Sequence, residues 1–264
     1  MSLDPKLPRS QTYRTIAAPV MVALLAACAA LGSAAQSPSA AAKLSPERIR
    51  EIVASPDRSE ADRKNDLRRK PAEMLAFIGV VPGMVVVDLS TGGGYTTELL
   101  ARSVGPTGRV YGQSTNPAAP ARLAERAKNP AAGNIVAVVQ KFEDPFPAAV
   151  ASNGVDLVTL MFNYHDFGHM GIDRAQTNKA VFAALKPGGM YVIADHSGRP
   201  GTGISEAGTL HRIEEAFLRK EVEAAGFKLV AEGGFLRNSA DPRDKETPDP
   251  AMPKDEFVLK FVKP

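Results

Sequence analysis

The sequence predicts an α/β fold in which helices cover both faces of a seven-stranded, mostly parallel sheet whose last strand is antiparallel. Seven short runs are rich in β-branched and aromatic residues, and helix-like stretches separate most of them. Strands that alternate with helices form a parallel sheet, because each crossover helix carries the chain back to the same edge. The seventh run has no helix before it, so we expect it to insert in the opposite direction.

The individual elements follow from this alternation. The predicted strands are Met84–Leu89, Arg109–Gln113, Ile135–Gln140, Val155–Asn163, Met190–Asp195, Phe227–Glu232 and Phe257–Val262. The predicted helices are Pro46–Val53, Glu60–Ile78, Tyr95–Val104, Ala118–Lys128, Asp173–Leu185 and Leu210–Ala225. Ser45 and Ser59 stand at the expected N-caps, since a serine hydroxyl accepts a hydrogen bond from a free amide of the first turn. Gly226 is expected to end the last helix, and the charged, proline-containing segment 237–253 is predicted to be a long loop.

The first 35 residues predict an export leader. Basic residues precede the apolar stretch 16–30 and small residues follow it, which is the three-part pattern of a secretory signal. Two processing routes stay open: a cut after Ala35, or lipidation of Cys28, because Leu25-Ala26-Ala27-Cys28 resembles a bacterial lipoprotein signal. Residues 36–45 then form a flexible tether and residues 46–264 the folded domain. The predicted location is the periplasm or, by lipid anchoring, the cell envelope, with membrane contact only through the leader or Cys28.

Composition limits the partners of the folded domain. The formal net charge is +3, and the leader supplies +2 of it from three basic residues and one acid, which leaves +1. No dense basic cluster with interleaved aromatic residues is present, so we expect no nucleic-acid partner. Acids interrupt the basic run between Arg63 and Lys70, which we interpret as a solvated helix face. Because Cys28 is the one cysteine, the folded domain contains no disulfide, and this suits an oxidising compartment.

The most informative stretch is the glycine-rich segment at 85–96, V-V-V-D-L-S-T-G-G-G-Y-T. A predicted strand ends at the acid Asp88, a turn of glycines follows, and a helix begins at Tyr95. Glycine is needed where the backbone turns sharply and a ligand approaches without a Cβ in the way. Ligands of open α/β sheets bind at the carboxyl ends of the strands. The sequence therefore predicts a ligand site here in a Rossmann-like fold, with a tight turn that binds nothing as the alternative. The spacing does not fit the dinucleotide fingerprint G-x-G-x-x-G.

This loop resembles motif I of the class I S-adenosylmethionine-dependent methyltransferases, in which glycines at alternate positions follow an acid. Asp88, Ser90, Gly92 and Gly94 fall on that pattern, with Ser90 in place of the first glycine. The turn L-K-P-G-G at 185–189 is also similar to one in that superfamily. The resemblance covers about residues 45–264. It is closest to a group of predicted bacterial methyltransferases with export leaders, with which the chain shares the segments D-L-x-x-G-G-G-Y, N-Y-H-D, A-D-H-S-x-x-P-G-T-G and L-H-R-I-E-E-A.

The resemblance implies S-adenosylmethionine as the cofactor. Members of the superfamily usually end the second strand in an acid that holds the ribose, but Gln113 stands here and brings no charge. After the third strand, Phe142 is expected to stack on the adenine and Glu143 to accept a hydrogen bond from its amine. The predicted cofactor-binding residues are Asp88, Ser90, Gly92, Gly94, Tyr95, Gln113, Phe142, Glu143 and Asn163.

The end of the fourth strand carries the predicted catalytic residues Tyr164, His165 and Asp166. The carboxyl ends of parallel strands meet at one edge, so these groups should face the glycine loop together with Asp195 and His196 from the fifth strand. They are expected to position or deprotonate the methyl acceptor, since a neutral imidazole near its own pKa is a suitable general base. The acceptor is expected to be a small molecule or a cell-envelope component.

Two other functions stay open. One is an exported binding protein that keeps the methyltransferase fold without methyl transfer, since fold alone does not fix function. The other is a metal-assisted enzyme in which His165, Asp166 and His169 bind an ion, with His196 or Asp195 completing two-His-one-carboxylate ligation. The spacing H-D-x-x-H matches no established metal signature, so no metal ligand is predicted.

Overall fold

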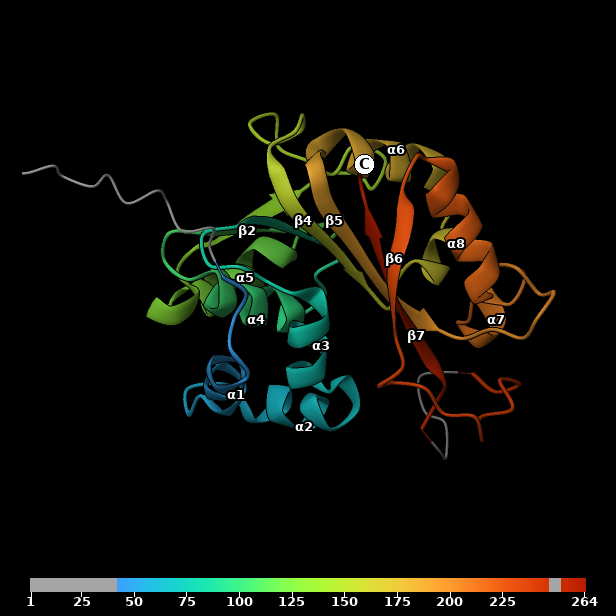
Figure 1. The fold of residues 1–264 in the computed structure, drawn as a ribbon, viewed down its shortest axis with the longest axis horizontal. Coiled ribbons are helices and arrows are strands. Elements are labelled where there is room, and N and C mark those ends of the chain that lie inside the picture. The colour runs from blue at the N-terminus through green and yellow to red at the C-terminus, as the bar shows by residue number, and fades with distance from the viewer. Residues whose placement is uncertain (1–41, 247–252) are drawn as a thin grey trace, which may run out of the picture. The chain divides into compact units, whose positions relative to one another are not determined.

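The computed structural model describes residues 42–246 and 253–264, so the predicted leader and residues 36–41 of the predicted tether lie outside the described residues. Seven strands form one sheet in the order β3-β2-β1-β4-β5-β7-β6 (Figure 1). The strands are β1 (Val85–Leu89), β2 (Arg109–Ser114), β3 (Ile135–Val139), β4 (Val155–Met161), β5 (Leu185–His196), β6 (Lys228–Gly233) and β7 (Glu256–Val262). Neighbouring strands from β3 to β5 are parallel, whereas β7 is antiparallel to both β5 and β6. The predicted fold class, including the antiparallel last strand, is confirmed.

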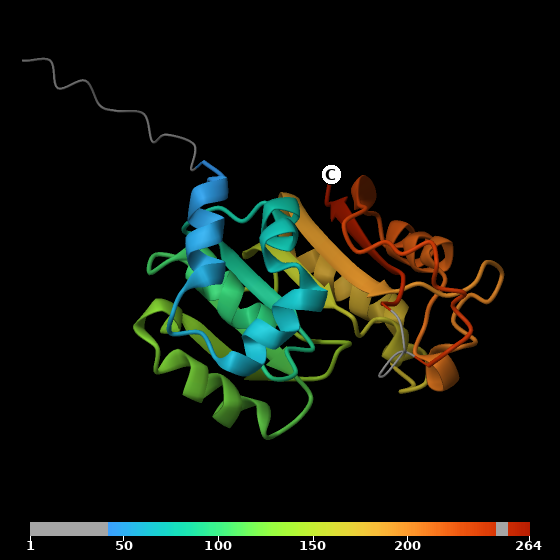
Figure 2. The same ribbon diagram turned by 90° about the horizontal axis from the view of Figure 1, so that it is seen from below.

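Helices cover both faces of this sheet. They are α1 (Pro46–Ala54), α2 (Glu60–Arg69), α3 (Pro71–Ile78), α4 (Tyr95–Val104), α5 (Ala119–Ala127), α6 (Arg174–Ala184), α7 (Ala207–Leu210) and α8 (Glu215–Ala224), with 3₁₀ turns η1 (Pro130–Ala132) and η2 (His165–Gly168). Figures 1 and 2 show α1–α3 and α8 on opposite sides of the sheet. Side chains of β1 point alternately into the two hydrophobic cores, one on each face of the sheet. Val86 packs into the core with α1, α3, α4 and α5, and Val87 into the core with α6 and α8. None of the described helices has the length and apolar character needed to span a bilayer.

The predicted helix over 60–78 is two helices. Ser59 caps α2 and Ser45 caps α1, as predicted. The break comes at Lys70, which adopts a left-handed φ of 43°, and at Pro71, which has no amide hydrogen to continue the helix. The break brings α2 beside the last strand, where Arg68 Nη1 lies 2.9 Å from the Glu256 carboxylate of β7.

The predicted helix from Leu210 to Ala225 is also interrupted. His211 takes a left-handed φ of 52°, so the chain leaves α7 at Leu210 and starts α8 only at Glu215. Gly226 follows α8 with a φ of 105°, the conformation expected where a glycine ends a helix. The interruption frees the His211 side chain from a helix face and allows it to reach the carboxyl edge of the sheet.

Candidate functional site

The glycine loop has the backbone that its motif requires. Ser90, Gly92 and Gly94 all adopt left-handed conformations, with φ values of 56°, 53° and 81°. Ser90 thus keeps the conformation of the glycine that it replaces. A Cβ built at Gly92 or Gly93 meets nothing within 4 Å, so these two positions border open space. A Cβ at Gly94 would lie 2.7 Å from Arg126 Cδ, so that glycine is needed for packing.

Asp88 lies beneath the loop rather than on its open side. Its carboxylate is 2 % exposed and accepts hydrogen bonds from the hydroxyls of Thr97 and Thr159, both at 2.7 Å. Burial raises the pKa of Asp88 to about 6. The side chain therefore ties β1 to α4 and β4, and it shapes the loop instead of presenting a free carboxylate to a ligand.

Gln113 does not reach the position predicted for it. Its side chain is fully buried; Oε1 accepts from the Ser90 amide at 3.1 Å, and Nε2 donates to the Gln140 carbonyl at 2.7 Å. Successive side chains of a strand point to opposite faces, and the residue that ends β2 is Ser114. The prediction that Gln113 holds a ribose is therefore wrong: Gln113 braces the loop from inside.

The roles predicted for two aromatic residues, Phe142 and Tyr164, are also corrected. Phe142 is buried, and its ring packs on Phe167 with centroids 4.5 Å apart, so it offers no free face for stacking on adenine. Tyr164 is fully buried; its hydroxyl donates to Glu221 of α8 at 3.0 Å and accepts from Asn178 of α6 at 2.8 Å. Tyr164 therefore belongs to the packing under α6 and α8 and does not face an acceptor.

The other predicted cofactor residues hold local structure together. The Tyr95 hydroxyl donates to Asp66 at 2.7 Å and so joins α4 to α2. Glu143 accepts a hydrogen bond from the Asp173 amide at 3.2 Å. Asn163 Nδ2 donates to Asp166 Oδ2 at 2.7 Å.

His165 and Asp166 do meet Asp195 at the carboxyl edge, as predicted. His165 is 3 % exposed; its Nδ1 lies 2.6 Å from Asp195 Oδ1, and its Nε2 lies 3.1 Å from Asp166 Oδ1. Burial alone would lower the pKa of His165, but the carboxylates of Asp195 and Asp166 outweigh it and raise that pKa to about 10. With no other ligand, His165 is therefore an imidazolium at neutral pH rather than the neutral base expected from sequence.

The remaining histidines divide between two places. His211 Nδ1 lies 3.3 Å and His169 Nε2 3.9 Å from Asp166 Oδ1. The His196 ring lies beside that of His165, with centroids 5.4 Å apart, but its Nδ1 is 2.9 Å from Glu256 Oε1, a pair that is not aligned as a hydrogen bond. Burial lowers the pKa of His196 well below its ordinary value.

The protonation of His165 predicts a pH dependence of stability. The folded-state pKa of about 10 lies above the ordinary value of 6.5, so the folded state binds more protons than the unfolded state between these values. The stabilisation is complete below about pH 6.5 and is lost as the pH rises towards 10. Urea unfolding of chelator-treated protein across this range should show a falling free energy of unfolding, and His165→Gln should flatten it. His196→Gln is the control, because the pKa of His196 lies below the window. Equal slopes for wild type and His165→Gln would contradict this assignment.

Arg69 is a residue that the sequence analysis missed. Its guanidinium carbon lies 3.9 Å from the centroid of the Phe162 ring, just after β4. Within the described ranges, no carboxylate or carbonyl accepts a hydrogen bond from it. Burial lowers the pKa of Arg69 to about 10, so it remains a cation at neutral pH. The basic run is therefore not a wholly solvated helix face. The sequence signal for the inward turn was Lys70-Pro71, which ends α2 at the strand ends.

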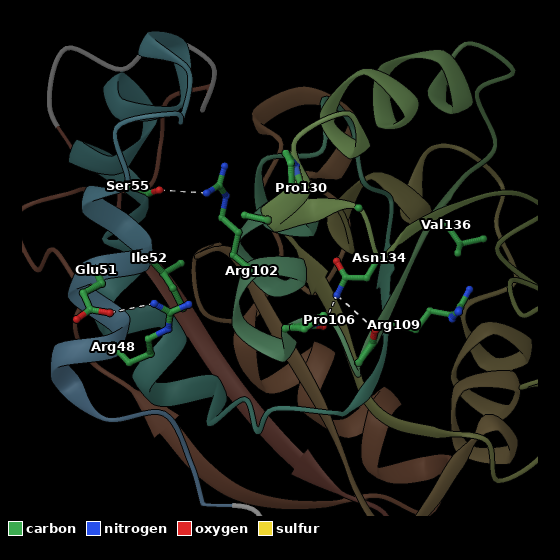
Figure 3. A pocket seen from close by; sticks show the side chains of 14 residues that line it. Arg48, Glu51, Ile52, Ser55, Arg102, Pro106, Arg109, Pro130, Asn134 and Val136 are labelled. Atoms are coloured by element: carbon green, nitrogen blue, oxygen red, sulfur yellow. Dashed lines mark hydrogen bonds and ion pairs between the residues drawn. The ribbon is translucent and has the colours of Figure 1, made fainter.

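A pocket of about 470 Å³ lies at the other edge of the sheet, where β2 and β3 begin (Figure 3). Its polar side chains largely bond with one another: Arg48 with Glu51 at 2.9 Å, and Arg102 with Ser55 at 3.2 Å. The glycine loop and the histidines lie at the opposite edge, so the candidate site is there and not in this pocket.

Residues 81–233 match the family model of the methyltransferase domain, which is more than half of the chain. Among curated proteins, the ubiquinone/menaquinone biosynthesis C-methyltransferase UbiE of Cupriavidus taiwanensis is 30% identical over 123 residues, 47% of each chain. The protein of the same name from Ectopseudomonas mendocina is 32% identical over 128 residues, 47% of this chain and 45% of its own. The chain thus spans about half the length of these relatives.

Solved structures share the fold at low identity. A SAM-dependent methyltransferase from Aquifex aeolicus superposes with a TM-score of 0.58 and 18% identity, over 84% of this chain and all of its own. The cyclase SpnF superposes with a TM-score of 0.56 and 16% identity, over 77% of this chain and 82% of its own. Because a cyclase stands among the neighbours, the likeness in fold does not by itself name a reaction.

Proposed function

Because the chain belongs to the methyltransferase domain family, we propose that it transfers a methyl group from S-adenosylmethionine to a small-molecule acceptor held beside His165 and Asp166. The observation that carries the proposal is the loop at the end of β1. There Ser90, Gly92 and Gly94 are left-handed, and Gly92 and Gly93 border open space. The quinone pathways in the names of the curated relatives belong to those proteins, and an acceptor screen of hydroxyl- and carbonyl-bearing small molecules tests this chain's own acceptor.

S-adenosylmethionine is the cofactor of this family and supplies an electrophilic methyl group on a sulfonium. The described residues fit its methionine end. The N-terminus of α4 faces the loop without a side-chain cap, and the Thr91 hydroxyl is buried without a partner in the described part of the chain. Free amides and the helix dipole there favour a carboxylate. The guanidinium of Arg69, which has no ionic or hydrogen-bonding partner among the residues that the structure describes, supplies a second positive group. At the ribose end, β2 finishes in the neutral Ser114, so we expect the methionine end to contribute most of the affinity.

The residues of the chain hold the acceptor rather than forming a bond to it. Displacement at a sulfonium methyl needs the nucleophile in line, so positioning supplies much of the rate. Burial opposes ionisation of Asp166, but the neighbouring His165 outweighs it and holds the pKa of Asp166 well below its usual range. Asp166 therefore stays a carboxylate and offers a hydrogen-bond acceptor to a hydroxyl of the incoming molecule.

Gly93→Val tests the cofactor position. The added side chain meets no protein atom at its Cβ, and no left-handed φ is required at Gly93, so the fold should be unchanged. If the cofactor lies against the loop, crowding should weaken its binding by about tenfold, equivalent to ~1.4 kcal/mol. Calorimetric titration with S-adenosylmethionine measures the loss. Gly133→Val is the matched control, since its Cβ would make only ordinary contacts far from the loop.

Three results would count against the proposal. If folded wild-type protein gives no heat of binding at millimolar S-adenosylmethionine, that compound is not its cofactor. Equal affinity for wild type and Gly93→Val would place the ligand elsewhere. Tight binding with no turnover over a broad acceptor screen would favour the alternative, an exported binding protein; the lack of an acid at the end of β2 is the observation in its favour.

We also propose that the folded domain works outside the cytoplasm. The support is the leader pattern in residues 1–35 together with the absence of cysteine from residues 46–264. Fractionation of cells that express the full chain should recover it in the periplasmic or envelope fraction. Cys28→Ala separates the two routes: it abolishes envelope retention if the cysteine is lipidated and changes nothing if the chain is cut after Ala35. Full-length protein in the cytoplasmic fraction would overturn the proposal.

A further inference from the structure

Three potential metal ligands from two distant segments converge at the carboxyl edge. His165 and Asp166 belong to η2, directly after β4, and His211 comes 45 residues after Asp166 at the end of α7. One nitrogen of each imidazole and one oxygen of Asp166 all lie within 4.8 Å of one another. The chain does not bring these groups together by local sequence; the fold does, through the interruption at His211.

The spacing of the three atoms suits a common metal ion. His165 Nε2 lies 3.1 Å and His211 Nδ1 lies 3.3 Å from the same oxygen, Asp166 Oδ1. Metal–ligand bonds of roughly 2.0–2.1 Å in tetrahedral geometry place neighbouring ligand atoms about 3.3 Å apart. An N–O distance of 3.3 Å is long for a hydrogen bond, and one carboxylate oxygen here faces more than one imidazole nitrogen.

The surrounding contacts orient the same atoms. The other nitrogen of His165, Nδ1, lies 2.6 Å from the fully buried Asp195, so Nε2 is left to face Asp166. Asn163 Nδ2 donates to Asp166 Oδ2 at 2.7 Å, so Oδ1 is left to face the histidines. Histidines that bind metals typically donate their second ring nitrogen to a carboxylate, and such partners fix the orientation of the ligand.

We propose that His165 Nε2, Asp166 Oδ1 and His211 Nδ1 bind a first-row transition-metal dication of the Zn²⁺ class. Two imidazole nitrogens and one carboxylate oxygen form a donor set that suits such ions. The carboxylates of Asp166 and Asp195 carry two negative charges, which match the charge of the ion. His169, with Nε2 3.9 Å from the same oxygen, lies close enough to become a fourth ligand after a small movement. His196 lies against Glu256 and takes no part.

This site goes beyond the proposed methyl transfer and does not depend on it. With three protein ligands, the ion keeps a free coordination position, and a dication there polarises an oxygen of a bound molecule. The acceptors that fit both sites carry a hydroxyl or carbonyl oxygen able to reach that position. The proposed ligand set differs from the sequence-based alternative: His211 takes the place of His169, and neither His196 nor Asp195 binds the ion directly.

Metal titration of untagged, chelator-treated protein tests the proposal without any cofactor. Co²⁺ alone should bind at one equivalent with visible absorption bands of a nitrogen- and oxygen-ligated site, and Zn²⁺ alone should displace it. Asp166→Asn and His211→Asn should each weaken Zn²⁺ binding by more than tenfold. Asn suits position 211 because it tolerates the left-handed backbone better than most residues. His196→Gln is the matched histidine control and should bind as wild type does.

Two outcomes would overturn the site. One is the absence of binding below millimolar Zn²⁺ in protein whose circular dichroism is that of a folded domain. The other is binding that survives both Asp166→Asn and His211→Asn, which would assign the ion to other side chains. Because S-adenosylmethionine is absent from these titrations, either failure leaves the test of the proposed function untouched.

Discussion

Replacing Arg126 with Met is expected to lower the free energy of unfolding by about 3–5 kcal/mol, a large share of the stability of a typical domain. Arg126 of α5 donates to both oxygens of Asp62 in α2, at 2.7 and 3.0 Å, and to Glu98 in α4 at 2.5 Å. Its Nε also donates to the carbonyl of Gly93 at 2.6 Å. A single guanidinium thus joins three helices and the glycine loop.

The cost arises from the carboxylates that the substitution leaves behind. The side chains of Asp62 and Glu98 are only 5% and 9% exposed. Burial disfavours the charged form of Asp62, but the Arg126 guanidinium outweighs it and holds the pKa of that carboxyl below its usual value. Removing one partner of a buried pair leaves an uncompensated charge, and this is why the loss exceeds that of a surface pair.

Chemical unfolding of three variants measures the effect. Arg219→Met removes an exposed pair with Glu223 and should cost at most about 1 kcal/mol. Adding Asp62→Asn to Arg126→Met removes one uncompensated buried charge and should restore part of the lost free energy of unfolding. The account fails if Arg126→Met and Arg219→Met are equally stable, or if Asp62→Asn recovers nothing.

Sequence patterning predicted the sheet well because strand and helix periods are local properties. The run Met84–Val87 is continuously apolar, and the run Val155–Met161 is apolar except for Asp156 and Thr159. Such runs are typical of strands buried on both faces, and each lies in a predicted strand. Turn chemistry was equally local: the glycines of the first loop take the left-handed conformations that their positions imply. The break at Lys70-Pro71 was predictable in the same way, since proline disfavours helical geometry in the residue before it.

The site was predicted only in part, because the direction of a side chain depends on packing. Tyr164 and His165 are neighbours in sequence, yet one points under α6 and α8 while the other meets Asp195. The pleat of β2 turns Gln113 inwards, and its amide supports Ser90. His211 reaches Asp166 only through a left-handed residue between two helices. No periodicity in the sequence carries that information.

Arg69→Met is expected to weaken S-adenosylmethionine binding by between about tenfold and a hundredfold, the equivalent of one charge-assisted hydrogen bond or ion pair. Arg69 is the cation beside the loop that has no ionic or hydrogen-bonding partner in the described part of the chain, and its guanidinium is stacked on Phe162. Burial lowers its pKa to about 10, so the charged form is held at a cost that a carboxylate ligand would offset. The ligand-free variant should therefore be as stable as wild type or slightly more stable, since Met preserves the contact with Phe162 without the charge.

Decarboxylated S-adenosylmethionine makes the test specific. If Arg69 binds the methionine carboxylate, wild type and Arg69→Met should bind this analogue equally, and the two changes should be strongly non-additive in a double-mutant cycle. Lys64→Met removes the same charge from the exposed side of α2 and controls for long-range electrostatics, so it should leave both affinities unchanged. Equal losses with both ligands would assign Arg69 to shaping the strand ends instead. A substitution that weakens ligand binding but leaves the protein equally or more stable identifies a residue that serves the ligand. Substituting a structural residue would lower both the stability and the affinity.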